Sequence, residues 1–521
     1  MTATTIPSRI LLMSGVTRMR THSKRPVSVA DTLAGARLGI ADLVVMVTSA
    51  AAPMTVIAAG ATLQWAVTGQ LGIPIAYLAV AAILTVFAVG LVDMSSHITN
   101  AGAFYAYITH GLGRHLGVGG SFIAVLAYNA MAVGMLGGAG AIASSWLADQ
   151  FDVSVPWWIC GLSFWALVTL FGVLRIDLNG RFLLFLLGGE ILVAAGLAAV
   201  HVAHPAGGVL TFDALNPWSL FTGSGAVLMV IGVTGFVGFE QTVVYAEEAK
   251  RPERTVRQAT FLSLALIGGL YAFASWAMSV AAGPDNIVAM ATEHGTELTF
   301  VLAGPYIPAF VNILGHILFV TSLLAGYLAF HNTAARYHYS LGREGVLPSW
   351  LGRISARTGA PMAGSWLQSA IGFSVVMLYA AMSWDPELYL FFWGTCIGGL
   401  GVLILMTLTS AAIPAYTWIR RRSGEAASLL RGVVAPLVAL VPLTWILVQT
   451  MLNIHIMLGL EPGDPLTWAA PVAFLSAAVL GVVWATVLRR ARPEVYYRIG
   501  RGIRVDSHLA QPVGLAVGSA R

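Results

Sequence analysis

The feature that most constrains this chain is the length of its uncharged, apolar stretches. Leu43 to Val92 is a run of 50 residues without a single Asp, Glu, Lys or Arg. A helix that crosses the hydrocarbon core of a bilayer needs about 20 predominantly apolar residues, so this run alone is long enough for two such helices. Only 10% of the chain is charged, which is too little to cover a water-facing surface. The sequence therefore predicts a protein surrounded by lipid and excludes a soluble enzyme.

Polar breaks and charged loops divide the chain into twelve expected membrane helices, so the expected fold class is an all-α membrane protein. The expected helices are two within Leu43 to Val92, separated at Gln64 to Pro74, then His115 to Ala148, Val153 to Leu174, Phe182 to Ala203, Ala214 to Ala246, Gln258 to Pro284, a short outer segment and a helix within Leu298 to Ala335, Thr358 to Trp384, Leu388 to Ile419, Gly432 to Leu460 and Pro465 to Leu488. They give four expected parts: an N-terminal tail (1–38), a ten-helix core (39–418), a final helix pair (432–488) and a C-terminal tail (489–521).

The basic residues predict how these helices are oriented. All 28 Lys and Arg residues fall in the two tails or in loops on the same side, while the other loops carry only acids such as Asp149, Asp213 and Glu461. Cytoplasmic loops hold the excess of Lys and Arg in membrane proteins. We therefore expect a multi-pass protein of the plasma membrane with both termini in the cytoplasm. The net charge of +5 reflects this orientation, and no basic patch interleaved with aromatic residues indicates a nucleic-acid partner.

Three carboxylates fall inside expected helices. Glu190 lies near the middle of the helix at Phe182 to Ala203, where an ionised carboxylate costs about 2.5–3.5 kcal/mol on insertion scales. It is a candidate for a group that gains and loses a proton, and the alternative is a protonated carboxyl that joins two helices as a structural hydrogen bond. Asp42 is expected to reach the headgroups or cap the first helix. Glu240 is expected to stabilise a backbone break or to take part in gating.

Other polar residues inside the expected helices are mostly interpreted as hydrogen bonds between helices. They are Tyr128 and Asn129 in the third helix and Asn312, His316, Thr321, Ser322, His331 and Asn332 in the eighth. His316 or His331 is an alternative proton carrier. Cys160 and Cys396 have neither metal-ligand nor redox-pair spacing and are interpreted as packing residues. We expect no cofactor and no metal, and no motif of an enzyme active site is present.

Two expected helices carry signals for a break in the middle of the membrane. In the first helix, Thr48 to Ala52 are small residues followed by Pro53, which lacks a backbone donor and disfavours helix at the residue before it. In the sixth helix, Gly232, Gly235 and Gly238 recur at every third position. Proline kinks and small residues at helix contacts are an alternative explanation for both. Exposed backbone at membrane depth is tolerated where it lines a cavity or is buried in protein, so both places are candidate sites.

The positions of these two breaks favour a transporter. Helices one and six are five helices apart, so a repeat of residues 39–205 onto 217–418 has the opposite orientation in the membrane. Paired broken helices in two inverted halves indicate a central substrate site. Their half-helix ends offer poles of both signs, which suits a small zwitterion or an amine.

The loop motifs resemble those of the amino acid/polyamine/organocation permeases from helix one to about helix ten. The motifs are Gly238-Phe239-Glu240 with Glu247-Glu248 and Pro252 to Thr255, Thr99 to Tyr107 with Gly113, and Arg336 with Leu341 to Gly345 and Leu347-Pro348 in the loop after helix eight. The resemblance implies a five-plus-five inverted-repeat fold, a substrate held between the broken helices and, often, uptake driven by protons.

Carried over residue by residue, the resemblance implies the site. The expected substrate-binding residues are Thr48, Ser49, Ala50, Ala51 and Ala52 in helix one, for a carboxylate, and Thr234, Gly235, Phe236 and Val237 in helix six, for an amine. The aromatic gate of some relatives falls on Thr234, so Phe236 or Phe239 is expected to gate instead. Glu190 stands where many proton-coupled members carry a lysine, so it is expected to carry the coupling proton or to attract a cationic substrate. Asp42, Glu240, Phe239, Tyr128 and Asn129 are expected to gate or support the site.

We therefore expect a secondary transporter that moves an amino acid or a related amine by alternating access, with protons as the coupling ion. The alternatives are a polyamine or organocation exchanger, an ion channel, and a membrane protein that senses a ligand without moving it.

Overall fold

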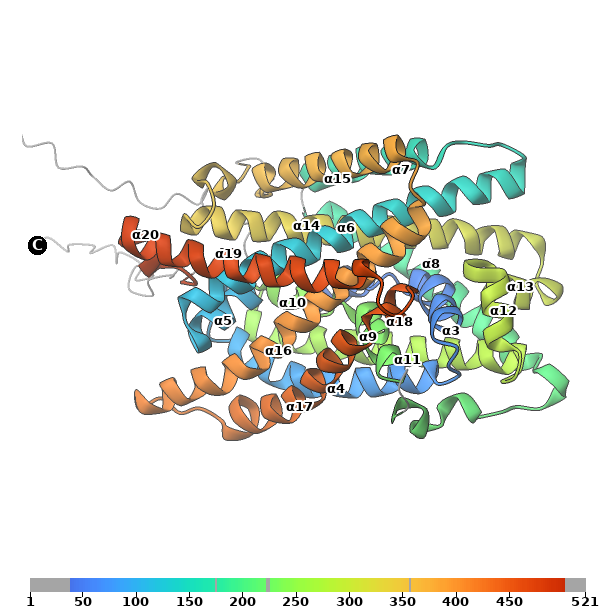
Figure 1. The fold of residues 1–521 in the computed structure, drawn as a ribbon, viewed down its shortest axis with the longest axis horizontal. Coiled ribbons are helices and arrows are strands. Elements are labelled where there is room, and N and C mark those ends of the chain that lie inside the picture. Colours follow the sequence, from blue (N-terminus) through green and yellow to red (C-terminus); the bar gives the residue numbers. More distant parts are fainter. Residues whose placement is uncertain (1–37, 174–175, 222–224, 356–357, 502–521) are drawn as a thin grey trace, which may run out of the picture.

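The chain forms a bundle of long helices. The computed structural model describes residues 38–173, 176–221, 225–355 and 358–501. Within these ranges there is no β-strand, and an isolated bridge pairs Leu38 with Ala249. The long helices run along the longest axis of the molecule in Figure 1, with α20 at one end and α12 and α13 near the other. We call the first end the terminal face and the second the opposite face.

Eleven helical segments of the described chain are long and apolar enough to cross a membrane. Nine of them are built on α4 (Ile73–Ser95), α6 (Arg114–Phe151), α8 (Ile176–Ala203), α11 (Pro252–Ala282), α14 (Ala309–Glu344), α15 (Met362–Met382), α16 (Trp393–Arg422), α17 (Ala435–Leu452) and α19 (Ala469–Ala491). The other two are interrupted, one as α1 (Ile40–Ala50), α2 (Pro53–Thr55) and α3 (Thr62–Thr68) and the other as α9 (Gly225–Phe236) and α10 (Gln241–Val244). The predicted membrane-protein class is confirmed.

The fourth expected helix corresponds to α7 (Trp157–Val173), an apolar helix of 17 residues. It is shorter than the roughly 20 residues of a typical membrane span. The count of twelve membrane helices and the inverted repeat therefore stay predictions.

Short helices and turns connect the long ones. The short α-helices are α5 (Phe104–Leu112), α12 (Ile287–His294), α13 (Leu298–Ala303), α18 (Ile454–Leu458) and α20 (Pro493–Arg498). Wider π-helical turns occupy Val56–Ala61, Pro386–Phe392 and Leu430–Val434. Tighter 3-10 turns occupy Ala206–Gly208, Asp213–Leu215, Pro217–Phe221, Ala246–Glu248, Gly295–Glu297, Gly304–Tyr306, Ser349–Gly352 and Pro465–Trp468.

Two predicted boundaries differ most from the structure. The sixth helix is expected from Ala214, but 3-10 turns occupy Asp213–Leu215 and Pro217–Phe221, and α9 is described from Gly225. Arg336 to Glu344 are expected in a loop and instead complete α14, which ends at Glu344 and is followed by Gly345 with φ of +86°. This stretch stays helical because Arg336 and Glu344 are buried and paired with side chains of other elements. The short outer segment expected before helix eight is two helices, α12 and α13.

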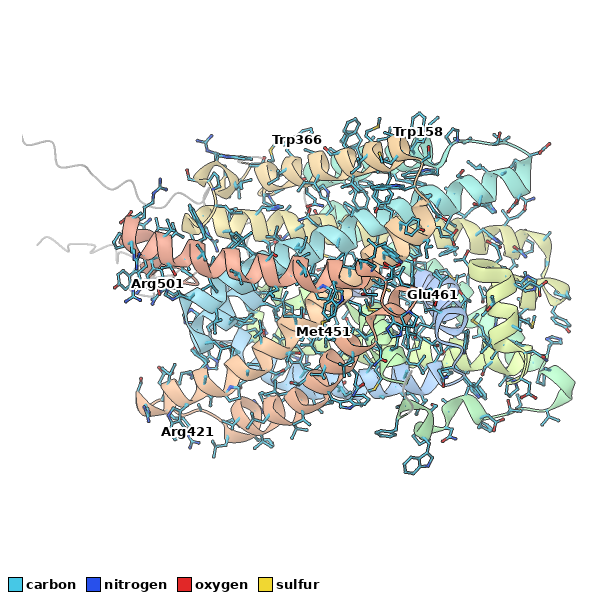
Figure 2. All side chains as sticks on the ribbon, in the orientation of Figure 1. Trp158, Trp366, Arg421, Met451, Glu461 and Arg501 are labelled. Carbon is cyan, nitrogen blue, oxygen red and sulfur yellow. The ribbon has the colours of Figure 1, made fainter. Side chains whose placement is uncertain are left out.

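The packing separates a buried core from a lipid-exposed shell. The long helix α6 packs against α14, α16 and α19, while α1 packs against α8, α11 and α14. The outer helices α15, α17 and α19 leave large apolar side chains exposed, as at Trp366, Val441 and Leu475. Because such side chains are stable in hydrocarbon, these helices form the expected lipid-facing surface. In Figure 2, Arg421 and Arg501 lie at the terminal face and Glu461 lies nearer the opposite face.

The predicted tails are described only in part. The N-terminal tail, residues 1–38, lies outside the described residues except for Leu38. Of the expected C-terminal tail, residues 489–501 are described; they complete α19 and form α20, and the remainder lies outside the described residues.

Candidate functional site

The first broken helix is interrupted between α1 and α2. The helix α1 ends at Ala50, and Ala52 adopts the left-handed conformation with φ of 48° before Pro53 restarts the helix. The pyrrolidine ring of Pro53 disfavours a helical conformation at Ala52, which explains the position of the break. The hydroxyl of Tyr271 donates a hydrogen bond of 2.7 Å to the carbonyl oxygen of Ala51. A carbonyl that the break removes from the helix is thus satisfied inside the membrane, as a buried backbone group requires.

The second broken helix is interrupted between α9 and α10. Gly238 has φ of +126°, a conformation that side chains disfavour and glycine adopts freely. The carboxylate of Glu240 accepts hydrogen bonds of 2.8 Å from the backbone N–H of Gly238 and of 2.8 Å from the Tyr128 hydroxyl of α6. Glu240 therefore fastens the break to a neighbouring helix.

The two breaks are in direct contact. A Cβ atom added to Gly238 would lie 2.9 Å from the Cβ of Ala50 and 3.1 Å from the backbone nitrogen of Ala51. This approach is possible only because Gly238 has no side chain. The sequence signals in the first and sixth helices thus mark one place in the structure.

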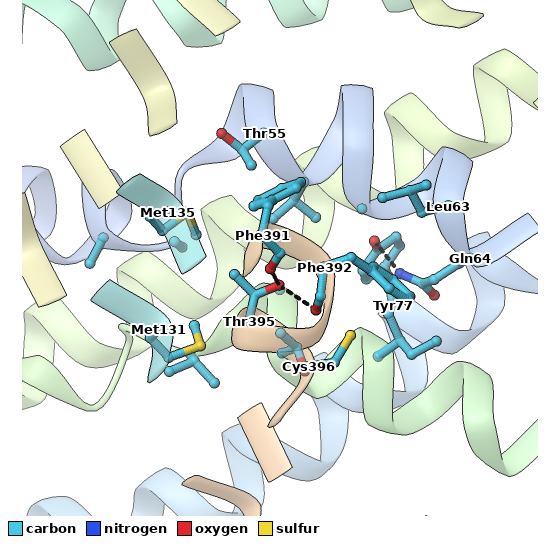
Figure 3. A pocket seen from close by; sticks show the side chains of 18 residues that line it. Thr55, Leu63, Gln64, Tyr77, Met131, Met135, Phe391, Phe392, Thr395 and Cys396 are labelled. Carbon is cyan, nitrogen blue, oxygen red and sulfur yellow. Dashed lines mark hydrogen bonds between the residues drawn. The ribbon is translucent and has the colours of Figure 1, made fainter. Parts of the chain in front are cut away.

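A cavity extends from this contact along the helix that follows Pro53. Its volume of about 50 Å³ leaves room for several water molecules. Predicted binding residues that line it are Ala50, Ala51, Thr234, Gly235 and Val237. The remaining lining residues are Thr55, Val56, Gly60, Leu63, Gln64, Tyr77, Met131, Met135, Ile231, Phe391, Phe392, Thr395 and Cys396 (Figure 3). None of these described lining residues carries a charge.

Four predicted binding residues are buried beside the cavity without lining it. They are Thr48, Ser49, Ala52 and Phe236. The Phe236 ring packs against the rings of Tyr271 and Tyr77, with centroids 5.7 and 6.4 Å away. Phe239, the other expected gate, packs edge-on against Phe87 at 6.3 Å.

Glu190 lies on the side of the first break that faces α14. Its side chain is 1% exposed, and its Oε2 accepts a hydrogen bond of 2.7 Å from the Ser322 hydroxyl of α14. The Ser322 hydroxyl in turn accepts one of 3.3 Å from the backbone N–H of Thr55, just after the break. Glu190 does not line the cavity, but this chain of hydrogen bonds connects it to the broken helix and to α14.

The two remaining predicted supporting residues and the two alternative proton carriers occupy separate places. Asp42 is exposed at the start of α1, where its Oδ2 accepts a hydrogen bond of 2.7 Å from the Gly39 N–H and caps the helix. The amide of Asn129 donates a hydrogen bond of 2.7 Å to the Val125 carbonyl one turn earlier. His331 contacts Ser365 of α15 at 2.9 Å, and His316 contacts Glu297 at 2.7 Å. These four side chains are outside the cavity.

Sequence reasoning missed the residues that α6 and α16 contribute to the cavity. Met131 and Met135 stand one turn apart on α6, and Phe391, Thr395 and Cys396 come from the start of the α16 span. The glycines of α16 were the available signal. A Cβ at Gly394 would lie 3.1 Å from the Cα of Gly134, and one at Gly398 would lie 2.5 Å from the Cγ of Met131. Small residues allow such close helix contact in membranes.

The terminal face is closed by ion pairs beneath the breaks. Arg336 of α14 is 4% exposed and donates to Glu248 at 2.8 and 3.3 Å, and its guanidinium lies 4.5 Å from the centroid of the Tyr245 ring. Arg343 binds both oxygens of Glu247 at 2.9 and 3.1 Å. Both acids lie in the loop after α10, so the broken helix is tied to α14 at this face.

A family model described as amino acid permease matches residues 38–485. The low-affinity putrescine importer PlaP of Escherichia coli (strain K12) is 24% identical over 282 residues, which cover 52% of this chain and 58% of that protein. The Asc-type amino acid transporter 1 of Mus musculus is 23% identical over 320 residues, which cover 60% of this chain and 54% of that protein. The chain thus spans a little over half the length of the curated relatives it matches.

Proposed function

Because the chain belongs to the amino acid permease family, we propose that it is a secondary transporter, not an enzyme, that moves an amino acid or a related amine by alternating access. The observation that carries this proposal is the contact between two broken helices beside a cavity. Half-helix ends at membrane depth present partial charges of both signs to a small solute. The protein spans the plasma membrane, and its terminal face lies in the cytoplasm.

Substrate passage then requires the two faces to open in turn. The cavity follows the part of the first broken helix that leads away from the terminal face. Toward the terminal face, the Glu240–Tyr128 hydrogen bond and the Arg336–Glu248 and Arg343–Glu247 pairs close the path. These contacts break and re-form in each cycle. Residues 39–205 and 217–418 are the two inverted halves, whose conformations interchange when the protein opens to the other side. Residues 432–488 pack against these halves.

An amino acid is a better substrate for this cavity than a polyamine. Its described lining residues are uncharged and include Met131, Met135, Phe391 and Phe392. A zwitterion carries compensating charges that the helix ends can meet, while its side chain contacts the apolar wall. A dication needs carboxylates close to its ammonium groups, because an unpaired charge is costly in a buried site. Polyamine or organocation exchange is the second candidate, favoured by the similarity to a putrescine importer.

Glu190 is the proposed site of the coupling proton. A carboxyl group surrounded by protein is costly to ionise, and in the structure it meets a hydroxyl of α14 that also binds the broken helix. Gain or loss of a proton at Glu190 changes which partner donates in this hydrogen-bond chain. The charge state of one carboxyl is thereby coupled to the position of the helix that contacts substrate.

Uptake into proteoliposomes tests the proposal. Labelled amino acids and putrescine are offered with and without an imposed pH gradient. Saturable uptake of an amino acid that follows the gradient supports the proposal, and preference for putrescine supports the exchanger. Unsaturable conduction of inorganic ions indicates a channel instead. Binding of a solute without transport indicates a sensor.

A further inference from the structure

The segment after α19 folds back over the terminal face and is partly buried there. The short helix α20 (Pro493–Arg498) and the next two residues lie over α5 (Phe104–Leu112) and the end of α14, at the terminal face (Figure 1). Ile499 is 1% exposed and Tyr496 is 7% exposed. We call residues 493–500 the docked segment.

Gly500 is the point at which the docked segment is fixed. Its N–H donates a hydrogen bond of 2.6 Å to Oε2 of Glu344, and its carbonyl accepts one of 2.9 Å from Nε2 of His110. Its φ is +79°, and an added Cβ would lie 2.6 Å from Cγ2 of Thr109. Any larger residue at this position therefore displaces the docked segment.

The acceptor, Glu344, is a buried carboxylate at the end of α14. Its Oε2 also accepts from the Tyr105 hydroxyl at 2.5 Å, and its Oε1 accepts from the Asn100 amide at 2.8 Å. The docked segment and the turn that begins at Asn100 thus share one carboxylate. Hydrogen bonds to a charged acceptor are stronger than those between neutral groups.

The same turn holds the loop of the second broken helix. The backbone N–H of Ala101 donates 3.0 Å to Oε1 of Glu247, which also binds Arg343. Oδ1 of Asn100 accepts from Ser340 of α14 at 2.7 Å. A continuous path therefore runs from Gly500 through Glu344 and the Asn100 turn to the loop after α10. That loop carries the ion pairs that must separate for the terminal face to open.

We propose that the docked segment is a latch that stabilises the state closed at the terminal face. The proposal rests on the function proposed above, since a latch acts only in a protein whose faces open in turn. Displacing Gly500 removes one hydrogen-bond donor from Glu344 and thereby loosens the turn that begins at Asn100. The hydrogen bond from the N–H of Ala101 in this turn to Glu247 is weakened in consequence. The face then opens more often toward the cytoplasm.

Thiol labelling tests the latch in protein reconstituted into nanodiscs, where both faces are accessible. The background carries Cys160→Ala and Cys396→Ala, and Ala246→Cys reports opening because Ala246 is buried in the loop after α10. Gly500→Val, Tyr105→Phe and a chain ending at Arg492 are compared with the unmodified latch. We expect Gly500→Val to raise the labelling rate roughly tenfold, the effect of losing about 1.4 kcal/mol from one charge-assisted hydrogen bond. Tyr105→Phe, which removes only a hydroxyl, is expected to give a smaller rise.

Two matched controls separate latch release from general damage. Tyr497→Phe removes an exposed hydroxyl within α20, and a chain ending at Arg501 keeps the docked segment; both are expected to label at the original rate. A cysteine introduced at exposed Val209 measures the labelling of a freely accessible thiol and is expected to react equally in all variants. A melting temperature close to that of the unmodified chain shows that each variant is folded. Unchanged labelling of the Ala246→Cys reporter in Gly500→Val and Tyr105→Phe would overturn the latch. The labelling needs no substrate. A chain that transports nothing therefore contradicts the proposed function but leaves the ratio of labelling rates between Gly500→Val and the unmodified latch unaffected.

Discussion

Replacing Glu190 by glutamine separates the proton from the shape of the side chain. The amide oxygen can still accept the hydrogen bond from Ser322, which in the structure is 2.7 Å long. The new NH₂ group takes the place of Oε1, which has no side-chain or backbone hydrogen-bond partner in the described structure. A buried polar group without a partner costs about 1 to 3 kcal/mol, so the variant is destabilised but folded. It cannot gain or lose a proton in the physiological range.

The size of the expected transport defect follows from the proton gradient. One pH unit across the membrane corresponds to about 1.4 kcal/mol, which supports about tenfold accumulation when one proton accompanies each substrate. If Glu190 carries that proton, Glu190→Gln loses this accumulation and equilibrates substrate to a ratio of about one. Exchange of labelled for unlabelled substrate needs no net proton movement and is expected to continue.

The assay compares both activities in the same proteoliposomes. Accumulation is measured under an inward gradient of one pH unit, and exchange is measured without a gradient. Glu461→Gln, at an exposed carboxylate near the opposite face, is the matched control and is expected to accumulate substrate like the unmodified chain. About tenfold accumulation by Glu190→Gln would refute the assignment of the coupling proton.

Three further predictions concern the breaks. Ala51→Trp places an indole in the cavity and is expected to abolish substrate binding in an equilibrium assay, whereas Leu78→Trp on the exposed surface of α4 is expected to bind normally; equal affinities would remove Ala51 from the site. Gly238→Ala forces a Cβ to 2.9 Å from Ala50 at a positive φ and is expected to destabilise the protein by about 1 to 3 kcal/mol, seen as a lower melting temperature, while Gly269→Ala, with open space around it, is expected to be neutral or stabilising. A Gly238→Ala protein as stable as Gly269→Ala would show that this close contact is absent. Tyr128→Phe leaves Oε1 of Glu240 without its 2.8 Å donor and is expected to slow transport more than it weakens binding, and an unchanged maximal rate would argue against a role in opening.

The fold was predictable where hydropathy and charge decide it. Runs without charge gave the long helices, and Pro53 and Gly238 marked breaks that the structure has. The extension of α14 through Arg336 was missed because an arginine usually ends a membrane helix. Here Glu248 pairs with it, and that partner is 88 residues away in the sequence. The start of α9 was missed because apolar 3-10 turns have the same hydropathy as a helix.

The candidate site was predictable only in its backbone. Small residues and a proline reveal where a helix opens, so Ala51 and Gly235 were found at the cavity. The opposite wall of the cavity depends on how α6 and α16 pack. The sequence alone does not distinguish an apolar residue that lines a cavity from one that packs between helices. Met131 and Phe391 therefore carried no signal of their own. Glu190 stood out as a buried charge, but its connection to the break through Ser322 needed the fold.

Cys396 lines the cavity between the two breaks, so its thiol reports whether the transported solute is held there. In a Cys160→Ala background, the rate of Cys396 alkylation is measured with increasing substrate. If the cavity holds the solute, substrate slows alkylation, with half-protection at the concentration that half-saturates transport. Alkylation that stays unchanged at saturating substrate, in protein that still transports, would contradict it.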